Sequence, residues 1–477
     1  MDKISEWESL LQSSGNAARI QIDSRLVGPG DIFVALNGCK VDGAKFVHDA
    51  LEAGAAYAVV RKDAGGFAAD ERIVFCEDPA ATLGELAGAA FGTKRLKARI
   101  VGVTGTNGKT SFTYILEHLL RSAGYKVGVI GTVETRWPGV VQDEGMTTPD
   151  CLRLHSILRE MGKDGVDIVC MEVSSHALDQ NRVAGIVFDY AVFTNLTQDH
   201  LDYHPDMEHY FKAKKKLFSP QEGQVPKAVV NVDDNYGREL ARDLGDALTY
   251  GLDKVFAPRL RGEISRLSPQ GLRMQCSYEH LAWEIESPLV GRYNASNLLA
   301  AMGTGLEMGL KISDFSSLRD FKGIPGRLQS IANARGIKVL VDYAHTPDAL
   351  ENCCLALRDT GLSFLVVVFG CGGNRDAGKR PIMGRIACKY ADVVIITSDN
   401  PRNEPPEAII SDILCGTDGC RKVLVEPDRR KALALGVEKC PMQGALLVAG
   451  KGHETYQEIG GKRREFDDAG VLSEVMA

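Results

Sequence analysis

Short apolar runs rich in β-branched residues, separated by helix-length amphipathic segments, place the strongest constraint on the fold of this chain. The last third contains IKVLVDYA, SFLVVVFG, ADVVIITSD, KVLVE and ALLVAG, and the middle contains ARIVGVTG, KVGVIG, VDIVCMEV, DYAVFTN and KAVVN. Strands that are apolar on both faces are typical of parallel sheets covered by helices. The pattern predicts an α/β fold with mostly parallel, doubly wound sheets, whose functional loops follow the carboxyl ends of the strands.

The domain organisation follows from length and from two breaks in this pattern. The chain has 477 residues, more than one hydrophobic core usually serves. The basic stretch TKRLK ends the first block, and the segment KGIPGR begins the last series of strands. We therefore expect three domains, at residues 1–96, 97–323 and 324–477, each of ordinary domain size. The last has the rhythm of a Rossmann-like domain.

Composition excludes several functional classes. The formal net charge is -7 and 44% of the residues are apolar, so neither a nucleic-acid nor a membrane partner is indicated. The amino terminus, MDKISEWESL, lacks the features of a signal peptide, and no apolar run is long enough to span a bilayer. These features predict a cytoplasmic protein. The 12 cysteines lack metal-like spacing, and we expect them to be reduced.

A glycine-rich loop carries the clearest functional signal. The strand ending near Val103 leads into TGTNGKTS and then into an amphipathic helix. Backbone N-H groups of such a loop approach phosphate oxygens, a lysine neutralises them, and a hydroxyl binds Mg²⁺. Val103 stands where the strict pattern has glycine, so a glycine-rich turn without ligand is the alternative. The sequence predicts ATP with Mg²⁺, held by Gly105, Thr106, Asn107, Gly108, Lys109, Thr110 and Ser111.

Acidic and histidine residues follow the next two buried strands. VDIVCM runs into EVSSHALDQNR, and DYAVFTN runs into LTQDHLDYH. Glu172 and His200 are the predicted Mg²⁺ ligands, and Asp199 can orient a ligand or a water. Taken singly, each is as well explained by capping or packing, and His176 and His204 stay ambiguous.

The next predicted helix, MEHYFKAKKKLFS, contains four lysines. We expect Lys212, Lys215 and Lys216 to form a solvated basic face. Periodicity gives no reason to single out Lys214.

The motifs GVTGTNGKTS, EVSSHAL, TNLTQDHLDYH, GRYNASN, GRLQ, DYAHTPDAL, FGCGGNRDAGKRP, DNPR and GKGHE occur in one order. This series resembles the Mur ligases, ATP-dependent enzymes that extend the peptide stem of the bacterial cell-wall precursor, and is most similar to those that add the third residue. The resemblance implies an N-terminal uridine-nucleotide domain, a central phosphate-loop ATPase domain and a C-terminal amino-acid domain. It implies a peptide synthase that acts in the cytoplasm, and we expect a monomer.

The resemblance also implies roles for individual residues. Lys214 occupies the position of a carbamylated lysine whose new carboxylate helps to hold a second Mg²⁺, beside Thr110, Glu172 and His200. Asn294 and Asn297 correspond to adenine-side asparagines, Arg327 to a hinge arginine, and Asp342 to an aspartate beside the nucleotide. The residues matching those that bind the uridine nucleotide and its dipeptide are Ser24, Arg25, Thr147, Thr148, Ser175, Gln180 and Arg182.

The implied acceptor is meso-diaminopimelate. Its second amino-acid centre suits a guanidinium, which binds a carboxylate in bidentate fashion, and an acidic group, which receives an ammonium. Arg402 of DNPR and Glu454 of GKGHE have these chemistries, although DNPR alone is also consistent with a strand-end turn. The remaining implied contacts are Arg375, Asp399, Asn400, Pro401 and Gly450.

The implied reaction joins diaminopimelate to the γ-carboxyl of UDP-N-acetylmuramoyl-L-alanyl-D-glutamate through an acyl phosphate. The alternatives are a sister ligase that uses L-lysine, a folylpolyglutamate synthetase, and a phosphate-loop ATPase without ligase activity. The DNPR motif and the N-terminal block discriminate among them.

Overall fold

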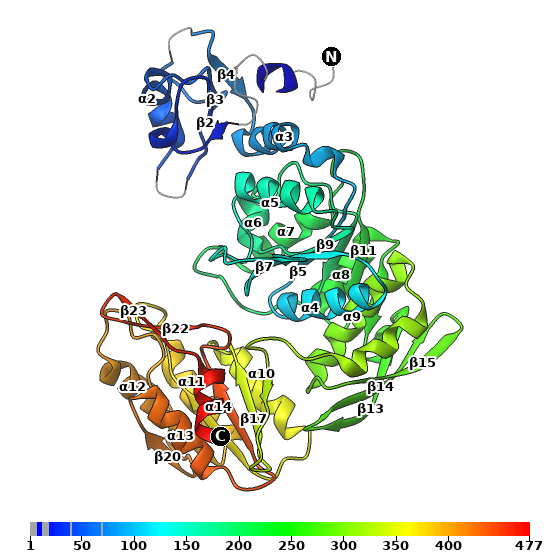
Figure 1. The fold of residues 1–477 in the computed structure, drawn as a ribbon, viewed down its shortest axis with the longest axis vertical. Helices are drawn as coiled ribbons and strands as arrows, with labels where there is room; N and C mark the ends of the chain where they lie inside the picture. The colour runs from blue at the N-terminus through cyan, green and yellow to red at the C-terminus, as the bar shows by residue number, and fades with distance from the viewer. Residues whose placement is uncertain (1–6, 12–18, 39–40, 68–69) are drawn as a thin grey trace. The chain divides into compact units, whose positions relative to one another are not determined.

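A computed structural model describes residues 7–11, 19–38, 41–67 and 70–477. The chain divides into two compact units, one of Met1–Tyr250 with Ala300–Leu310, and one of Gly251–Leu299 with Lys311–Ala477. Figure 1 shows the elements within each.

The first sheet of the first unit consists of four parallel strands in the order β1-β2-β3-β4. Helix α3 begins well because Asp78 accepts from the N-H groups of Ala80 and Ala81, and Pro79 takes the first helical position. Successive strand residues face opposite sides, so that Val59 packs toward α3 and Val60 toward α2. The elements are β1 (Ile20–Gln21), β2 (Ile32–Val34), α2 (Val47–Glu52), β3 (Tyr57–Arg61), β4 (Ile73–Cys76) and α3 (Pro79–Phe91), with short 3-10 helices at Ser24–Leu26, Gly43–Phe46 and Thr93–Arg95.

The second sheet of this unit has the order β12-β11-β10-β5-β9-β6-β7-β8. Strands β5, β6 and β9 to β12 run parallel, whereas β7 and β8 add an antiparallel hairpin that the sequence did not predict. The strands are β5 (Arg99–Thr104), β6 (Val127–Ile130), β7 (Thr135–Trp137), β8 (Val140–Gln142), β9 (Ile168–Glu172), β10 (Tyr190–Phe193), β11 (Lys227–Asn231) and β12 (Leu248–Gly251).

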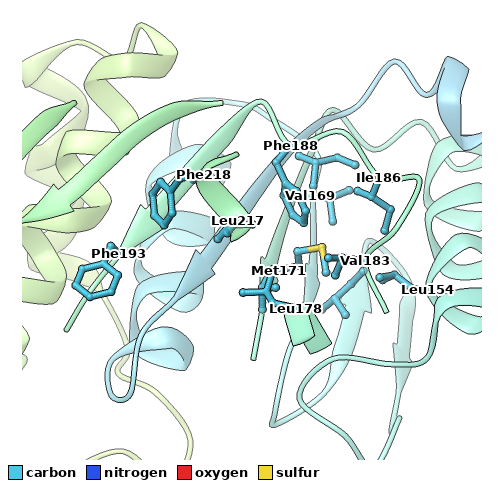
Figure 2. Packing of buried hydrophobic residues seen from close by; sticks show 14 of the residues in the cluster. Leu154, Val169, Met171, Leu178, Val183, Ile186, Phe188, Phe193, Leu217 and Phe218 are labelled. Carbon is cyan, nitrogen blue, oxygen red and sulfur yellow. The ribbon is translucent and has the colours of Figure 1, made fainter. Parts of the chain in front are cut away.

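Helices cover both faces of this sheet. Figure 1 shows α5 and α6 over one face and α4 over the other. Figure 2 shows Val169 and Met171 of β9 packed with Leu154 of α5 and Leu178 of α6, within a buried apolar cluster. The apolar runs are therefore strands buried on both sides, as predicted. The helices are α4 (Lys109–Ser122), α5 (Cys151–Lys163), α6 (Ser175–Asp179), α7 (Met207–Lys215) and α8 (Asn235–Leu244), followed after α7 by a 3-10 turn at Lys216–Phe218.

The second unit begins with an antiparallel arrangement that the sequence analysis also missed. Strand β14 (Gly271–Tyr278) pairs with β13 (Leu260–Ser268) and β15 (Leu281–Ser287). Leu272, Met274 and Cys276 of β14 alternate inward and are buried. Helix α9 (Arg292–Met308) follows, with 3-10 helices at Lys254–Phe256 and Ile312–Asp320.

A six-stranded sheet forms the rest of this unit, in the order β16-β17-β21-β18-β19-β20, parallel except for β16. Val367 of β18 packs toward α10, α11 and α12, and Val366 packs toward α13 and α14. The predicted Rossmann-like, doubly wound arrangement is confirmed. Its elements are β16 (Gln329–Ile331), β17 (Lys338–Asp342), α10 (Pro347–Arg358), β18 (Leu365–Phe369), α11 (Lys379–Tyr390), β19 (Val393–Ile396), α12 (Pro406–Leu414), β20 (Val423–Val425), α13 (Arg429–Lys439), β21 (Ala445–Ala449), β22 (Tyr456–Ile459), β23 (Lys462–Glu465) and α14 (Asp468–Met476).

The expectation that all cysteines are reduced is wrong for one pair. Cys388 of α11 and Cys420, in the loop after α12, form a disulfide with a Cα-Cα distance of 4.8 Å. The two are 32 residues apart in the chain, so only the packing of α12 against α11 reveals the pairing. Cys39 lies outside the described residues, and the other described cysteines are unpaired thiols. None of the helices described is both long and apolar enough to cross a membrane.

Candidate active site

The glycine-rich loop joins β5 to α4, as predicted. Gly105 and Gly108 have φ angles of +149° and +89°, which residues with a side chain rarely adopt. A Cβ on Gly105 would lie 1.9 Å from Thr194 Oγ1, so glycine is needed there. The residue that precedes α4, Gly108, has no side chain that could cap the helix. The first N-H groups of a helix can bind an anion.

The loop is held by its neighbour, the segment after β10. The N-H of Thr106 donates to the Asn195 carbonyl at 2.9 Å, and the N-H of Asn107 donates to Asn195 Oδ1 at 3.0 Å. Lys109 Nζ folds over the loop and donates to the carbonyls of Gly105 at 2.8 Å and Thr106 at 2.9 Å. Ser111 is buried in the first turn of α4. The loop thus has a defined shape with its lysine lying across it.

Glu172 lies at the carboxyl end of β9 and is 1% exposed. Its carboxylate accepts from Thr110 Oγ1 at 3.1 Å, Thr132 Oγ1 at 2.9 Å and the Thr132 N-H at 3.0 Å. A Cβ on Gly131 would come within 2.4 Å of this carboxylate. The structure therefore brings Glu172 and Thr110 into direct contact beside the phosphate-type loop, as the sequence predicted.

Lys214 is buried, whereas its three neighbouring lysines are on the surface. Lys214 is 2% exposed, and the side chains of Lys212, Lys215 and Lys216 are 64%, 39% and 48% exposed. The statement that periodicity does not single out Lys214 is wrong. It lies four residues after Tyr210, on the buried face of α7, and helical spacing places such residues on one face.

The surroundings of Lys214 are unusual for a cation. Its Nζ donates to the Gly105 carbonyl at 2.9 Å and lies 4.5 Å from the centre of the Tyr210 ring. It forms no ion pair with a carboxylate in the described parts of the chain. Burial, and then the charge of Lys109, lower the pKa of Lys214 well below its usual value, while Asp199 opposes them more weakly. The neutral amine is therefore favoured.

Histidines and tyrosines gather around the segment after β10. The His200 ring centre lies 4.9 Å from that of His176, and the His176 ring lies 4.1 Å from Tyr203 and 5.7 Å from His204. His200 has a φ of +54°, and its Nε2 lies 3.5 Å from Asp199 Oδ2. Burial is the main cause that lowers the pKa of His176, His200 and His204. The cluster therefore favours uncharged imidazoles.

The residues expected to hold the dipeptide are joined in one network. Arg182 donates to the Gln180 side-chain oxygen at 2.7 Å and to the Thr148 carbonyl at 3.1 Å. Thr148 Oγ1 donates to the Glu172 carbonyl at 3.0 Å, and Thr147 Oγ1 lies 3.0 Å from Thr132 Oγ1. A separate feature is the buried Ser175 hydroxyl, which has no hydrogen-bond partner among the described residues.

Ser24 and Arg25 lie in the 3-10 helix Ser24–Leu26, which follows strand β1 of the first sheet. The Arg25 side chain is 86% exposed and contacts Asp23 at 2.6 Å. Hydrogen bonds from Arg25 lower the pKa of Asp23 to about 2. These residues present charge and polar groups to solvent near β1.

In the second unit, Asn294 and Asn297 lie one helical turn apart in α9 and are both buried. Asn294 Nδ2 donates to the Val290 carbonyl at 2.9 Å, and Asn297 Nδ2 donates to Asn294 Oδ1 at 3.3 Å. The predicted pair is thus held on one side of α9.

Asp342 ends β17 and anchors the segment that contains Arg327. Its carboxylate accepts from the N-H groups of Leu328 at 2.7 Å and Ala344 at 2.8 Å. Burial raises the pKa of Asp342, although Arg327 and these N-H groups oppose the shift. The Arg327 guanidinium lies 5.1 Å from the centre of the Tyr343 ring. The two predicted residues therefore share one corner of the sheet.

The predicted acceptor residues gather on loops at the carboxyl ends of β18, β19 and β21. Asn400 Nδ2 donates to Glu454 Oε2 at 2.8 Å, and the Asn400 N-H donates to Asp399 Oδ1 at 2.7 Å. A Cβ on Gly450 would meet Asp399 Oδ2 at 2.3 Å. Pro401 is buried, and Arg375 is exposed.

Arg402 is oriented by two neighbouring segments. It has a φ of +51°, its N-H donates to the Glu458 carbonyl at 3.0 Å, and its Nη1 donates to the Gly373 carbonyl at 2.7 Å. Its Nε lies 3.8 Å from Glu458 Oε2. The guanidinium is thus fixed on the same loop cluster as Glu454, as the motifs predicted.

The sequence analysis missed two residues in these sites. Thr132, which donates two hydrogen bonds to the Glu172 carboxylate, directly follows the KVGVIG run. Its position at the end of a strand is the signal that could have revealed it. Lys451 is 0% exposed and contacts Asn400 and Glu454. It lies inside the GKGHE motif, between the predicted site residues Gly450 and Glu454.

The donors beside the loop suit Mg²⁺ in chemistry. The buried Glu172 carboxylate and Thr110 hydroxyl are hard oxygen ligands, and they touch each other. The described residues contain no group of three or more His, Cys, Asp or Glu side chains that could hold a metal ion. A complete site therefore needs oxygen ligands of another kind, from hydroxyl groups, phosphates or a modified side chain.

Three family models match the chain in succession. The Mur ligase family, catalytic domain, matches residues 17–90, the Mur ligase middle domain matches 103–305, and the Mur ligase, glutamate ligase domain, matches 326–452. Together they account for most of the chain.

Relatives match over almost the whole length. "UDP-N-acetylmuramoyl-L-alanyl-D-glutamate--2,6-diaminopimelate ligase" of Lawsonia intracellularis is 47% identical over 96% of this chain and 95% of its own. The protein of the same name from Gloeobacter violaceus is 42% identical over 96% and 94%. A solved structure of an enzyme of this name is 33% identical, with a TM-score of 0.72, over 96% of this chain and 94% of its own. The predicted three-domain α/β fold and the family resemblance are confirmed. The chain is therefore a ligase, and it belongs to the Mur ligase family.

Proposed function

We propose that the chain joins 2,6-diaminopimelate to the D-glutamyl γ-carboxyl of UDP-N-acetylmuramoyl-L-alanyl-D-glutamate, with ATP as the energy source, in peptidoglycan precursor synthesis. The observation that carries the proposal is the 47% identity to a ligase with those two substrates in its name, over 96% of this chain. The fixed Arg402 beside Glu454 supports the same acceptor, because diaminopimelate brings a carboxylate and an ammonium together.

The three domains have their proposed limits at 1–96, 97–323 and 324–477. The family models support this division, since they match 17–90, 103–305 and 326–452. The first domain binds the uridine nucleotide near Ser24 and Arg25, the second binds ATP, and the third binds the amino acid. We propose that the enzyme works in the cytoplasm, where ATP and the nucleotide substrate are available, as a monomer.

The loop after β5 binds the phosphates of ATP in this proposal. The uncapped N-H groups of α4 face the phosphates, and Lys109 leaves the loop carbonyls to neutralise them. Thr106, Asn107 and Ser111 complete the loop with Gly105 and Gly108. The adenine lies beside Asn294 and Asn297, and Arg327 and Asp342 approach the nucleotide from the third domain.

Mg²⁺ fits the oxygen donors of Glu172 and Thr110. In this proposal these residues hold it with His200 and with the carboxylate of a carbamylated Lys214. Bound Mg²⁺ reduces the negative charge on the reacting phosphate and carboxylate oxygens.

The buried, uncharged Lys214 supports the carbamate. A neutral amine can attack CO₂ and lose one proton, which gives an anionic carbamate, whereas an ammonium has no lone pair with which to attack. The fold favours the neutral amine because burial lowers the pKa of Lys214, and because its Nζ donates to a neutral carbonyl. Carbamylation would change a basic side chain into an acidic one at this position.

The Arg182 network orients the dipeptide. Arg182 and Gln180 support the segment after β9, Thr147 and Thr148 approach from the loop before α5, and the unpartnered Ser175 hydroxyl is free to bind a substrate oxygen. These contacts lie next to Glu172 through Thr148, so the D-glutamyl carboxylate is held close to the ATP loop.

The reaction has two steps. The D-glutamyl γ-carboxylate attacks the γ-phosphorus of ATP, the bond to the bridging oxygen breaks, and ADP and an acyl phosphate form. The amine of diaminopimelate then attacks the acyl carbon, and phosphate leaves as the amide forms. Lys109 reduces the repulsion between the two anions in the first step. Arg402, Glu454, Arg375, Asp399, Asn400, Pro401 and Gly450 position the acceptor for the second.

The test is phosphate release by the purified enzyme with ATP, Mg²⁺ and UDP-N-acetylmuramoyl-L-alanyl-D-glutamate, with meso-diaminopimelate or L-lysine as the acceptor. We expect release with diaminopimelate and formation of the tripeptide nucleotide. Release with lysine alone would leave the ligase reaction and overturn the acceptor. Phosphate release that needs neither amino acid nor dipeptide would identify an ATPase, and release with folate and glutamate would identify a folylpolyglutamate synthetase.

A further inference from the structure

We infer that Lys451 is a positioning residue for the acceptor amino acid, a buried ammonium that holds Asn400 and Glu454 in place and balances the charge of the acceptor loops. The inference rests on the proposed function, because it concerns how that function's second substrate is selected.

Lys451 is the second residue after β21, and its side chain is 0% exposed. Its Nζ donates to Asn400 Oδ1 at 3.0 Å and to Glu454 Oε2 at 3.1 Å. Asn400 Nδ2 donates to the same Glu454 oxygen at 2.8 Å. The three side chains therefore close a ring of hydrogen bonds between the loops after β19 and β21.

The ring also connects to Arg402. Asn400 Oδ1 accepts a second hydrogen bond, from the Glu458 N-H at 2.9 Å. The Glu458 carbonyl accepts from the Arg402 N-H at 3.0 Å. The ammonium of Lys451 thus contacts the Glu454 carboxylate directly and is linked to the backbone of Arg402 through Asn400 and Glu458. Glu454 and Arg402 are the two residues that the proposal gives to the distal amino-acid centre of diaminopimelate.

One oxygen of Glu454 remains available. Both hydrogen bonds of its carboxylate go to Oε2, and Oε1 has no hydrogen-bond partner among the described residues. The side chain is 18% exposed. Lys451 therefore fixes one edge of the carboxylate and leaves the other for the ammonium of an incoming amino acid.

Charge balance gives Lys451 a role in selectivity. Glu454, Asp399 and Glu458 are acidic, and Lys451 and Arg402 are basic, so the loop cluster offers both signs of charge to an amino-acid centre that carries both. Removal of the Lys451 ammonium makes the cluster more negative, which favours a lone cation such as the side chain of L-lysine over a zwitterion. A residue that only stabilised the fold would not change this preference.

The rival role for Lys451 is purely structural. Gly450 and Gly452 on either side have φ angles of +118° and +55°, and a Cβ on Gly452 would meet Tyr343 at 2.6 Å. The loop is therefore tightly packed, and a substitution of Lys451 could lower stability alone. A control for this effect is Arg358, whose Nη2 pairs with Asp392 at 2.7 Å at the opposite, amino-terminal end of strand β19.

The experiment compares wild type, Lys451→Met and Arg358→Met in steady-state phosphate release, with thermal unfolding measured in parallel. For Lys451→Met we expect the KM for diaminopimelate to rise about tenfold or more, with the KM for ATP within about twofold of wild type. We also expect the ratio of kcat/KM for diaminopimelate to that for L-lysine to fall about tenfold or more. Arg358→Met should lower the unfolding temperature and leave both quantities unchanged.

A Lys451→Met enzyme with unchanged KM and unchanged acceptor ratio would overturn the inference, whatever its stability. If that variant does not fold, Lys451→Gln, which keeps a donor toward Asn400 without the charge, decides by the same two measurements. Failure of the proposed function itself is a separate result, since wild type would then show no release with diaminopimelate.

Discussion

Two buried lysines lie at the carboxyl ends of parallel strands in different parts of the molecule, and their surroundings are opposite. Lys214 of α7 donates to the carbonyl of Gly105, which directly follows β5, and has no carboxylate partner in the described residues. Lys451, after β21, donates to a carboxylate and to an amide oxygen. A buried charge is stable only when it is paired. The first lysine therefore lies in surroundings that lower its pKa, whereas the second is held by hydrogen bonds to a carboxylate and an amide oxygen.

The difference teaches how this fold uses strand ends. At the central sheet, Lys214 is buried beside the glycine-rich loop without a carboxylate partner among the described residues. At the C-terminal sheet, Lys451 is buried with partners that fix it to two loops. The proposed function assigns the chemical step to the first sheet edge and the selection of the acceptor to the second.

The largest effect that we expect comes from Lys214→Ala. Loss of the carbamate carboxylate should lower kcat by about a thousandfold, because a single oriented charge at a phosphoryl-transfer site has an effect of this order. Addition of a small carboxylate such as acetate should restore part of the activity. Phosphate release measures both.

Lys451→Met is the matched control for this rescue. Its defect lies in geometry and charge balance, so acetate should not restore it. An active Lys214→Ala enzyme, or an inactive one that carboxylates never rescue, would contradict the carbamate.

The second effect concerns Arg402→Ala. Loss of the guanidinium should raise the KM for diaminopimelate about a hundredfold, as expected for a charge-assisted bidentate contact worth about 2–3 kcal/mol. The KM for ATP should stay near that of wild type. The control is Arg463→Ala, on the exposed strand β23 that pairs with β22, which should behave as wild type. Equal changes in both KM values would show that Arg402 supports the domain rather than the acceptor.

Sequence alone predicted most of the fold because its signal is local. Each run such as SFLVVVFG is apolar on both faces, and the structure buries it between two layers of helices. The antiparallel strands β13, β14 and β15 were missed, since β13 (Leu260–Ser268) alternates polar and apolar residues around Arg261 and Glu263 without a long apolar run. The Cys388–Cys420 disulfide was missed because tertiary packing alone brings the two thiols together.

The candidate site was predicted as far as motifs mark it. Glu172, Thr110 and the loops of Arg402 and Glu454 were found because they follow buried strands. The burial of Lys214 was missed although its spacing from Tyr210 encodes it, and Lys451 was missed because a lysine in a glycine-rich turn is usually solvated. In both cases the role of the lysine depends on tertiary contacts, which the sequence does not show.

The free energy of unfolding provides a second comparison between the two lysines, in which the expected effects are smaller but opposite in sign. In bicarbonate-free buffer at pH 7, Lys214→Met should stabilise the protein by about 1–3 kcal/mol, because it removes a buried amine that has no carboxylate partner among the described residues. Lys451→Met should destabilise it by about 1–3 kcal/mol, because Glu454 loses its cationic partner and keeps only the amide of Asn400. Thermal unfolding followed by calorimetry measures the two shifts, and equal signs would contradict the distinction between the lysines.

The pH dependence of the Lys214→Met effect follows from its lowered pKa. Folding disfavours the charged form, so the penalty that the substitution removes is present below the unfolded-state pKa of about 10.5. The penalty disappears as the pH rises toward that value, since the amine is then neutral in both states. The stabilisation by Lys214→Met should therefore be larger at pH 7 than at pH 10.

The smallest effect is expected two residues before Lys214, at Lys212. Its side chain is 64% exposed and pairs with Glu208 at 2.8 Å across one turn of α7. Exposed pairs of this kind contribute little, so Lys212→Ala should leave kcat within about twofold and the unfolding temperature within about one degree of wild type. Because Lys212 and Lys214 share a helix and a charge, the contrast between Lys212→Ala and Lys214→Ala isolates burial as the property that matters. A large loss of activity in Lys212→Ala would instead show that the whole basic face of α7 acts on the substrate.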